Sequence, residues 1–269
     1  MATAVNALRL GEKYAAKRML RVIVRRWIGL GLPLPSGSGT VGRMIWDLKH
    51  WGSCQFLEVR KPFVSQYGQD IVVSELMEDR SGTFLDVGAF DGISFSNSYY
   101  LEKHLGWKGV CVEPNPLQFP RLRESRSCIC EQVAVVACAT DDMEFTVLAG
   151  EGAMLSGLCG TVSDEKASRI KQLMEDGKTH PQKVKVSCRT VPEILRNASL
   201  PTVDFISLDI EGGELEIVNS LDYDQLGTRV IAVEANNKSR ELAACLEKWG
   251  FNLVSILGDD CIFYRSQDG

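Results

Sequence analysis

Short apolar segments alternate with amphipathic segments from residue 63 onward, and this alternation constrains the fold more than any other feature. Strands are predicted at residues 83–87, 109–113, 129–137, 204–209 and 229–234, with helices at 94–106, 116–125, 214–221 and 239–249. Residues 251–257 and 261–265 form two further strands joined by a Gly-Asp-Asp turn. This order predicts an α/β, Rossmann-like domain with a mostly parallel, doubly wound sheet and an antiparallel C-terminal hairpin.

One domain over residues 61–269 accommodates this pattern, and it contains a long insertion. Residues 143–148 and 183–189 are predicted to form a pair of strands. Between them, residues 149–181 are polar, with a helix expected at 163–176. Because long insertions in compact domains are often functional, we interpret 149–181 as a lid. Residues 36–60 are expected to form a linker and a short helical cover.

Charge is distributed unevenly between a basic N-terminal arm, residues 1–35, and the rest of the chain. The arm has seven basic side chains and one acidic side chain, a charge of +6, whereas the remaining residues carry −11 and the whole chain −5. Five basic residues recur every four positions, on one side of an amphipathic helix: Arg9, Lys13, Lys17, Arg21 and Arg25. One hypothesis is peripheral contact with an anionic membrane. The other is packing on the body or on a second subunit of a homo-oligomer.

Composition excludes several classes of protein. The hydrophobic fraction of 45% and the charged fraction of 24% are typical of a globular chain rather than a disordered or collagen-like one. An acidic body argues against binding of duplex DNA, so no nucleic-acid partner is expected. The nine cysteines show no C-x-x-C spacing. We therefore expect no structural zinc site, and interpret the cysteines as reduced thiols of a cytoplasmic protein.

The loop after the first predicted strand contains Asp86, Gly88, Asp91 and Gly92. Ligands of parallel sheets bind beyond the carboxyl ends of the strands, at the topological switch point. The glycines permit a tight turn and a close backbone approach, but their spacing is not the G-x-G-x-x-G of dinucleotide folds. Two carboxylates would repel a pyrophosphate and attract a cation. The loop therefore favours S-adenosylmethionine (SAM), which carries a sulfonium and an ammonium group.

A second cofactor contact is predicted after the next strand, at Glu113 and Asn115. From such a position a carboxylate can accept hydrogen bonds from both hydroxyls of a ribose. The glycine loop and the spaced acid together are more specific than either feature alone. Substitution of Asp86 or Glu113 by Ala is therefore expected to weaken SAM binding.

Polar residues also follow the two later parallel strands, at Asp209, Glu211, Glu234 and Asn236. One hypothesis makes Asp209 or Glu211 a general base or an orienter of the substrate hydroxyl, with Glu234 and Asn236 binding substrate. Another makes Asp209, Glu234 and Asn236 ligands of Mg²⁺, which prefers carboxylate and amide oxygens. Glu214 is explained at least as well by capping of the following helix.

Six motifs follow one another along the chain: residues 65–70 (SQYGQD), 84–92 (FLDVGAFDG), 96–98 (SNS), 101–109 (LEKHLGWKG), 112–116 (VEPNP) and 205–214 (FISLDIEGGE). With these motifs the sequence resembles the FkbM-type SAM-dependent methyltransferases over roughly residues 63–265. The resemblance implies a class I, Rossmann-like methyltransferase fold, SAM as the donor and methyl transfer to an oxygen. Its acceptors are typically hydroxyls of sugars or natural products.

By this resemblance the loop after the first strand and Glu113 belong to the cofactor site, while Asp209 and Glu211 lie beside the reaction centre. The sequence departs from the family pattern at Gly213, where a polar residue or His often stands before Glu214. That departure bears on substrate contacts. Residues 1–35 lie outside the resemblance.

Residues 65–70 allow two interpretations. Gln66 and Gln69 could fold over the edge of the cofactor and contact its carboxylate or adenine, and this interpretation is preferred. The alternative is a helix start, with Ser65 as the N-cap and Gln69 near the first turn.

The sequence thus predicts a cytoplasmic SAM-dependent O-methyltransferase that acts on a small-molecule or glycan acceptor. One alternative is a non-catalytic binding or adaptor protein that kept the fold and is targeted by its basic arm. Another is an NAD-dependent oxidoreductase, against which the missing G-x-G-x-x-G counts.

Overall fold

The computed structural model describes residues 63–159, 164–235 and 238–266. The predictions for the basic arm, for the helical cover and for Asn236 lie outside these residues. The strands of the central sheet are β1 (Thr83–Val87), β2 (Lys108–Val112), β3 (Ile129–Glu131), β9 (Phe205–Leu208), β10 (Val230–Glu234), β11 (Asn252–Leu257) and β12 (Asp260–Tyr264). The helices around it are α3 (Gln69–Leu76), α4 (Tyr99–Leu105), α5 (Phe119–Ser125), α7 (Val191–Asn197), α8 (Glu214–Ser220), α9 (Tyr223–Leu226) and α10 (Ser239–Glu247).

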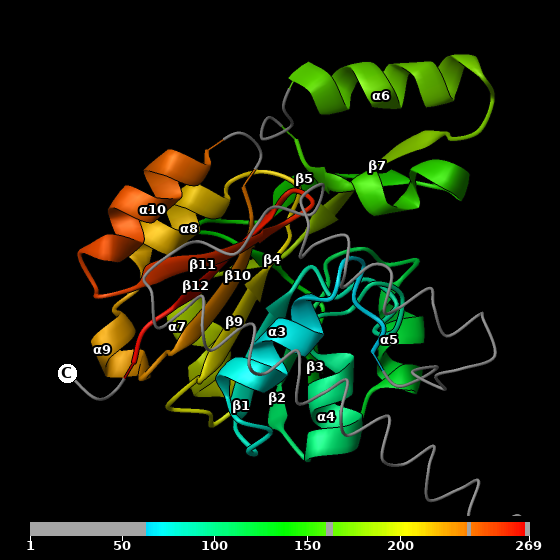
Figure 1. Ribbon diagram of the computed structural model, residues 1–269. Coiled ribbons are helices and arrows are strands. Elements are labelled where there is room, and N and C mark those ends of the chain that lie inside the picture. The colour runs from blue at the N-terminus through cyan, green and yellow to red at the C-terminus, as the bar shows by residue number, and fades with distance from the viewer. Residues whose placement is uncertain (1–62, 160–163, 236–237, 267–269) are drawn as a thin grey trace, which may run out of the picture.

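The central sheet has seven strands in the order β11-β12-β10-β9-β1-β2-β3 (Figure 1). Strands β3, β2, β1, β9 and β10 pair in parallel. Strand β12 is antiparallel to both β10 and β11. The predicted doubly wound sheet with an antiparallel C-terminal hairpin is therefore confirmed. Its topological switch point lies between β1 and β9, where the order of the strands reverses.

Each face of the sheet is buried by its own helices, because side chains alternate between the two faces along a strand. Leu85 and Val87 of β1 belong to a core with residues of α7, α8 and α10. Phe84 of the same strand packs with residues of α3, α4 and α5 on the opposite face. The sheet thus lies between two layers of helices.

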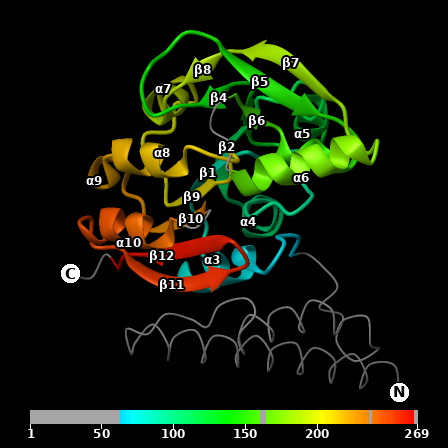
Figure 2. The ribbon, with the colours of Figure 1, turned by 90° about the horizontal axis from the view of Figure 1, so that it is seen from above.

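The predicted insertion forms a small sheet with two helices. Strand β5 (Met143–Leu148) pairs antiparallel with β6 (Gly157–Leu158) and β7 (Pro181–Val186). The predicted pairing is therefore confirmed, but the second strand ends at Val186 and not at residue 189. The 3-10 helix η1 (Gly150–Leu155) and helix α6 (Asp164–Glu175) lie between these strands in sequence. Figure 2 shows α6 on the same side of the molecule as β5 and β7. None of the described helices is long and apolar enough to cross a bilayer.

Several predicted elements are wrong in their bounds; the helix predicted at 116–125, for example, begins only at Phe119. The helix predicted at 94–106 begins only at Tyr99, because Ser96 and Ser98 precede it in a loop and donate their hydroxyls to Asp86. The strand predicted at 129–137 is divided into β3 and β4 (Ala134–Val135). After Glu131 the chain leaves the central sheet, and β4 pairs with β8 (Cys188–Arg189) in a separate two-stranded sheet.

At Gly88 the loop after β1 comes close to the backbone that follows β9. Gly88 has a φ of +82°, and a Cβ added there would lie 1.7 Å from the carbonyl oxygen of Asp209. The Asp209 amide in turn donates to the carbonyl of Val87 at 3.0 Å. Only glycine permits both the left-handed backbone and this contact. The loop after β1 is thereby fixed against the residue that follows β9.

We expect Gly88→Ala to destabilise the fold by about 3 kcal/mol or more, since backbone atoms must shift to admit the methyl group. Gly106→Ala is the matched control: Gly106 has a φ of +70° but no neighbouring atom within 4 Å of an added Cβ. Its cost should be the backbone strain alone, about 1 kcal/mol. Urea unfolding measures both variants, and equal losses of stability would contradict the close-approach argument.

Candidate active site

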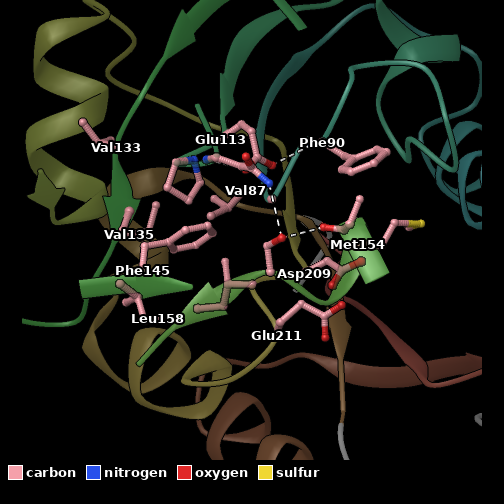
Figure 3. A pocket seen from close by; sticks show the side chains of 17 residues that line it. Val87, Phe90, Glu113, Val133, Val135, Phe145, Met154, Leu158, Asp209 and Glu211 are labelled. Atoms are coloured by element: carbon pink, nitrogen blue, oxygen red, sulfur yellow. Dashed lines mark hydrogen bonds between the residues drawn. The ribbon is translucent and has the colours of Figure 1, made fainter. Parts of the chain in front are cut away.

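A cavity opens at the switch point, beyond the carboxyl ends of β1, β2 and β9 (Figure 3). Apolar side chains and three carboxylates line its walls. The apolar residues include Val133, Val135, Phe145, Met154 and Leu158. The carboxylates are those of Glu113, Asp209 and Glu211. The predicted insertion supplies Met154 and Leu158.

Glu113 is held at the end of β2 by two backbone amides. The Phe90 amide donates to Glu113 Oε2 at 2.9 Å and the Asn115 amide to Oε1 at 2.8 Å. Burial raises the pKa of Glu113 to about 7, against the lowering effect of these amides. The Asn115 side chain donates to the Ser156 hydroxyl at 3.3 Å, which ties the end of β2 to the insertion. Both predicted cofactor residues therefore line the cavity.

Asp86 belongs to a buried ionic network rather than to the cavity wall. Its carboxylate accepts from Ser98 and lies 3.9 Å from Arg126 Nη1. Arg126 also pairs with Glu102, whose pKa is held at about 2 by the guanidinium and other donors despite partial burial. For Asp86, burial outweighs the attraction of Arg126, and its pKa is raised. Through Arg126, which donates to Gly92, Ser96 and Ser98, this network fixes the loop of residues 88–98.

The other predicted cofactor residues differ in position. Gly88 lines the cavity. Asp91 is turned onto its own loop, where it accepts from the Ile93 and Ser94 amides at 2.9 and 2.7 Å. Gly92 packs on α5, because a Cβ there would lie 2.4 Å from Ser125 Oγ. Neither Asp91 nor Gly92 is among the residues that line the cavity.

The segment at residues 65–70 begins a helix. Gly68 is the N-cap of α3, and the Ser65 hydroxyl donates to the Asp70 carboxylate while it accepts from the Asp70 backbone amide at 3.3 Å. Gln66 is exposed and donates to the Tyr67 hydroxyl, whereas Gln69 is buried and donates to Asp260 Oδ2 at 2.6 Å. Gln66 and Gln69 do not line the cavity, and their contact with a cofactor stays a prediction.

Three carboxylates from the ends of β9 and β10 meet beside the cavity. Oxygens of Asp209, Glu211 and Glu234 all lie within 4.8 Å of one another. Asp260 is the register partner of Glu234 on β12. Surrounding protein displaces much of the hydration of Asp209, although solvent still reaches the side chain. This desolvation and the charges of Glu234 and Asp260 raise the pKa of Asp209 well above its usual value.

Asp260 shows the same effect. Burial, together with the neighbouring Glu234, raises the pKa of Asp260 to about 7, despite the hydrogen bond from Gln69. Glu211 adds an unusual backbone, with a φ of +66°. Left-handed residues with side chains are uncommon and gather at functional sites. The site thus concentrates negative charge and strain at one edge of the sheet.

The predicted Mg²⁺ ligands are brought together only in part. Asp209 and Glu234 meet as expected, but Glu211 joins them, and Asn236 lies outside the described residues. A cation of the chain already contacts this set, because the Lys166 ammonium of α6 pairs with Glu211. Two like charges cannot share such a position without strong repulsion. The described residues therefore do not fit a divalent ion as they stand.

Lys166 and Asp260 also belong to the site, although the sequence pattern does not indicate either residue. Lys166 lies in a polar helix of the insertion, among other charged residues that carry no motif. Asp260 stands in the hairpin turn, where acidic residues are ordinary. Its signal was the register of the hairpin, which places the first residue of β12 opposite the last residue of β10.

Comparisons with solved structures give low sequence identity. A candidate sarcosine dimethylglycine methyltransferase from Galdieria sulphuraria is 11% identical with a TM-score of 0.32, covering 69% of this chain and 61% of its own length. The delta-N METTL16 methyltransferase domain is 14% identical with a TM-score of 0.34, over 93% of this chain and 94% of that chain. A human methyltransferase 10 domain containing protein is 13% identical with a TM-score of 0.33, over 96% and 98%.

Comparison with families gives a definite result, whereas no curated protein matches the chain significantly. The model of the methyltransferase FkbM domain matches residues 86–253. This match begins in β1, includes the loop after it and the cavity residues, and ends in β11. It covers more than half of the sequence, and the chain therefore belongs to the FkbM methyltransferase family.

Proposed function

We propose that this protein is a SAM-dependent O-methyltransferase whose acceptor is a hydroxyl of a sugar, a glycan or a natural product. Membership of the FkbM family supports methylation with SAM as the donor. The oxygen acceptor rests on one observation: the Asp209 carboxylate, with its raised pKa, faces the same cavity as the Glu113 carboxylate. A base next to a cofactor pocket is suited to removing the proton of a hydroxyl.

The residues of the cavity fit the proposed donor. Three carboxylates and neither Lys nor Arg are found among the described residues that line it. When bound, SAM supplies an electrophilic methyl group on a positively charged sulfur. Glu113 would accept from the ribose hydroxyls, for which its carboxylate is already oriented by two backbone amides. The apolar wall at Val133 and Phe145 suits an adenine ring.

Asp209 is the residue proposed to take the proton of the acceptor hydroxyl as the oxygen forms its new bond to carbon. A raised pKa brings this carboxylate closer in basicity to the working pH, which favours proton transfer. The fixed contact between Gly88 and the Asp209 backbone holds the base at a set position relative to the cofactor loop. Much of the rate enhancement is then expected to come from this alignment.

Glu113→Ala and Asp86→Ala are both expected to lower the affinity for SAM in calorimetry, by about tenfold, since each carboxylate supports the donor site. Both variants should also lower the unfolding temperature, because Asp86→Ala leaves Arg126 without one of its buried partners and Glu113→Ala leaves two backbone amides without their acceptor. Affinity of the unaltered protein should rise between about pH 6 and pH 8 as Glu113 ionises near its pKa of about 7. Unchanged affinity in both variants would contradict the cofactor site.

Transfer of a labelled methyl group from SAM to a panel of hydroxylated acceptors tests the function itself. Asp209→Asn is expected to reduce kcat by about 10² to 10⁴-fold while SAM stays bound. Since the pKa of Asp209 is raised, the rate should increase with pH above the usual carboxylate range. Glu247→Gln, an exposed carboxylate on α10, is the control. Binding of SAM without turnover of any acceptor would favour the non-catalytic adaptor instead.

The basic arm is proposed to bring the enzyme to an anionic membrane surface, on the basis of its sequence alone. Deletion of residues 1–35 should abolish sedimentation with vesicles that contain anionic lipid. Vesicles of neutral lipid serve as the control, and added salt should weaken binding of the full chain. Association that persists after deletion would show that the arm has another role.

A further inference from the structure

The carboxylate cluster of Asp209, Glu211 and Glu234 has the composition of a divalent-cation site but contains a cation of its own. Three carboxylates with oxygens within 4.8 Å of one another repel each other unless positive charge lies among them. Hard divalent ions commonly provide that charge. In this chain the ammonium group of Lys166 pairs with Glu211 at the edge of the cluster.

The contact between Lys166 and Glu211 is shielded from bulk water. The side chains are 10% and 14% exposed, in contrast to the pair of Lys171 and Glu175 on the same helix, at 78% and 59%. Exposed pairs of the latter kind contribute little. A shielded pair is strong only while both partners are present, because either charge alone would be left desolvated.

Lys166 also interacts electrostatically with other carboxylates of the cluster. Burial lowers the pKa of Lys166, while the negative charges of Glu234, Asp209 and Glu214 act in the opposite direction. These three residues follow or flank β9 and β10, so one lysine of the insertion faces carboxylates from two strands of the central sheet. The ammonium group is therefore the counter-charge of the whole cluster and not only of Glu211.

We propose that Lys166 is a built-in cation that takes the place of a divalent metal in this cluster, positions Glu211, and makes the methyl transfer independent of metal. The part about catalysis rests on the proposed function, whereas the replacement of a metal does not. Lys166 is a positioning residue: it acts through the carboxylates and need not touch the reacting atoms. The left-handed backbone of Glu211 is compatible with this role, since the ion pair offsets its strain.

Lys166 and the carboxylates that it balances belong to different parts of the fold. Lys166 belongs to α6, the helix between β6 and β7, whereas the carboxylates belong to the central sheet (Figure 1). A freely diffusing metal would charge-balance the cluster wherever the insertion lies. A tethered ammonium does so only when α6 is in contact with the end of β9.

Mn²⁺ is the probe for the test, because its binding removes the electron paramagnetic resonance signal of the free ion without any acceptor. The variant is Lys166→Met, which keeps most of the unbranched side chain and removes its charge. Lys171→Met, an exposed lysine of the same helix, is the matched control. We expect the unaltered protein and the control to bind Mn²⁺ weakly, and Lys166→Met to bind it about tenfold more tightly or better.

A second variant locates the bound ion. Adding Glu211→Gln to Lys166→Met should remove the gained affinity, since one carboxylate ligand is lost. Lys166→Arg keeps the charge and should behave as the unaltered protein. Circular dichroism of each variant establishes that it is folded. Equal Mn²⁺ affinity of the unaltered protein and a folded Lys166→Met variant, whether tight or weak, would overturn the proposal.

Methyl transfer gives an independent readout. Activity of the unaltered protein should be insensitive to EDTA, whereas Lys166→Met should lose activity and recover part of it with Mg²⁺. Activity of the unaltered protein that EDTA abolishes and Mg²⁺ restores would also overturn the proposal. Failure to methylate any acceptor would contradict the proposed function alone, because the Mn²⁺ titration requires no turnover.

Discussion

The contact between Gly88 and the carbonyl of Asp209 is the constraint on which the rest of the site depends. It joins the ends of β1 and β9, the two strands at which the order of the sheet reverses. A residue with a side chain at this position would separate them, and the cavity between the loop after β1 and the loop after β9 would lose its shape. This backbone contact therefore fixes the cofactor loop relative to Asp209, the proposed base. The alignment of donor and base depends on the backbone rather than on flexible side chains.

The buried and partly buried carboxylates are the second organising feature of the site, and they fall into two groups. Asp86 and Glu102 are balanced by buried Arg126 behind the cofactor loop, which gives a rigid support. Glu113, Asp209 and Asp260 have raised pKa values, because loss of hydration and neighbouring carboxylates outweigh the groups that stabilise their charge. Carboxylates with raised pKa values are typical of sites that bind cations or transfer protons.

The fold could be predicted from the sequence because apolar strands and amphipathic helices differ clearly in period. The residues that follow β1, β2 and β9 could be placed near one another by the rule for parallel sheets, and Glu113 and Asp209 do face one cavity. Side-chain direction could not be predicted. Asp86 points to Arg126 and Asp91 to its own loop, since alternation along a strand and local turn geometry decide which face each side chain takes.

The hydrogen bond from Gln69 to Asp260 joins residues separated by 191 positions. Gln69 begins the first described helix, and Asp260 begins the last strand. Because β12 pairs with β10, Asp260 joins the acidic edge of the site only after the β11–β12 hairpin has folded back. During synthesis on the ribosome, most of the sheet can therefore be made before the site is complete. A chain synthesised only as far as β10 contains the cofactor loop but lacks Asp260. The order of synthesis therefore delays completion of the acidic cluster until β12 has paired with β10.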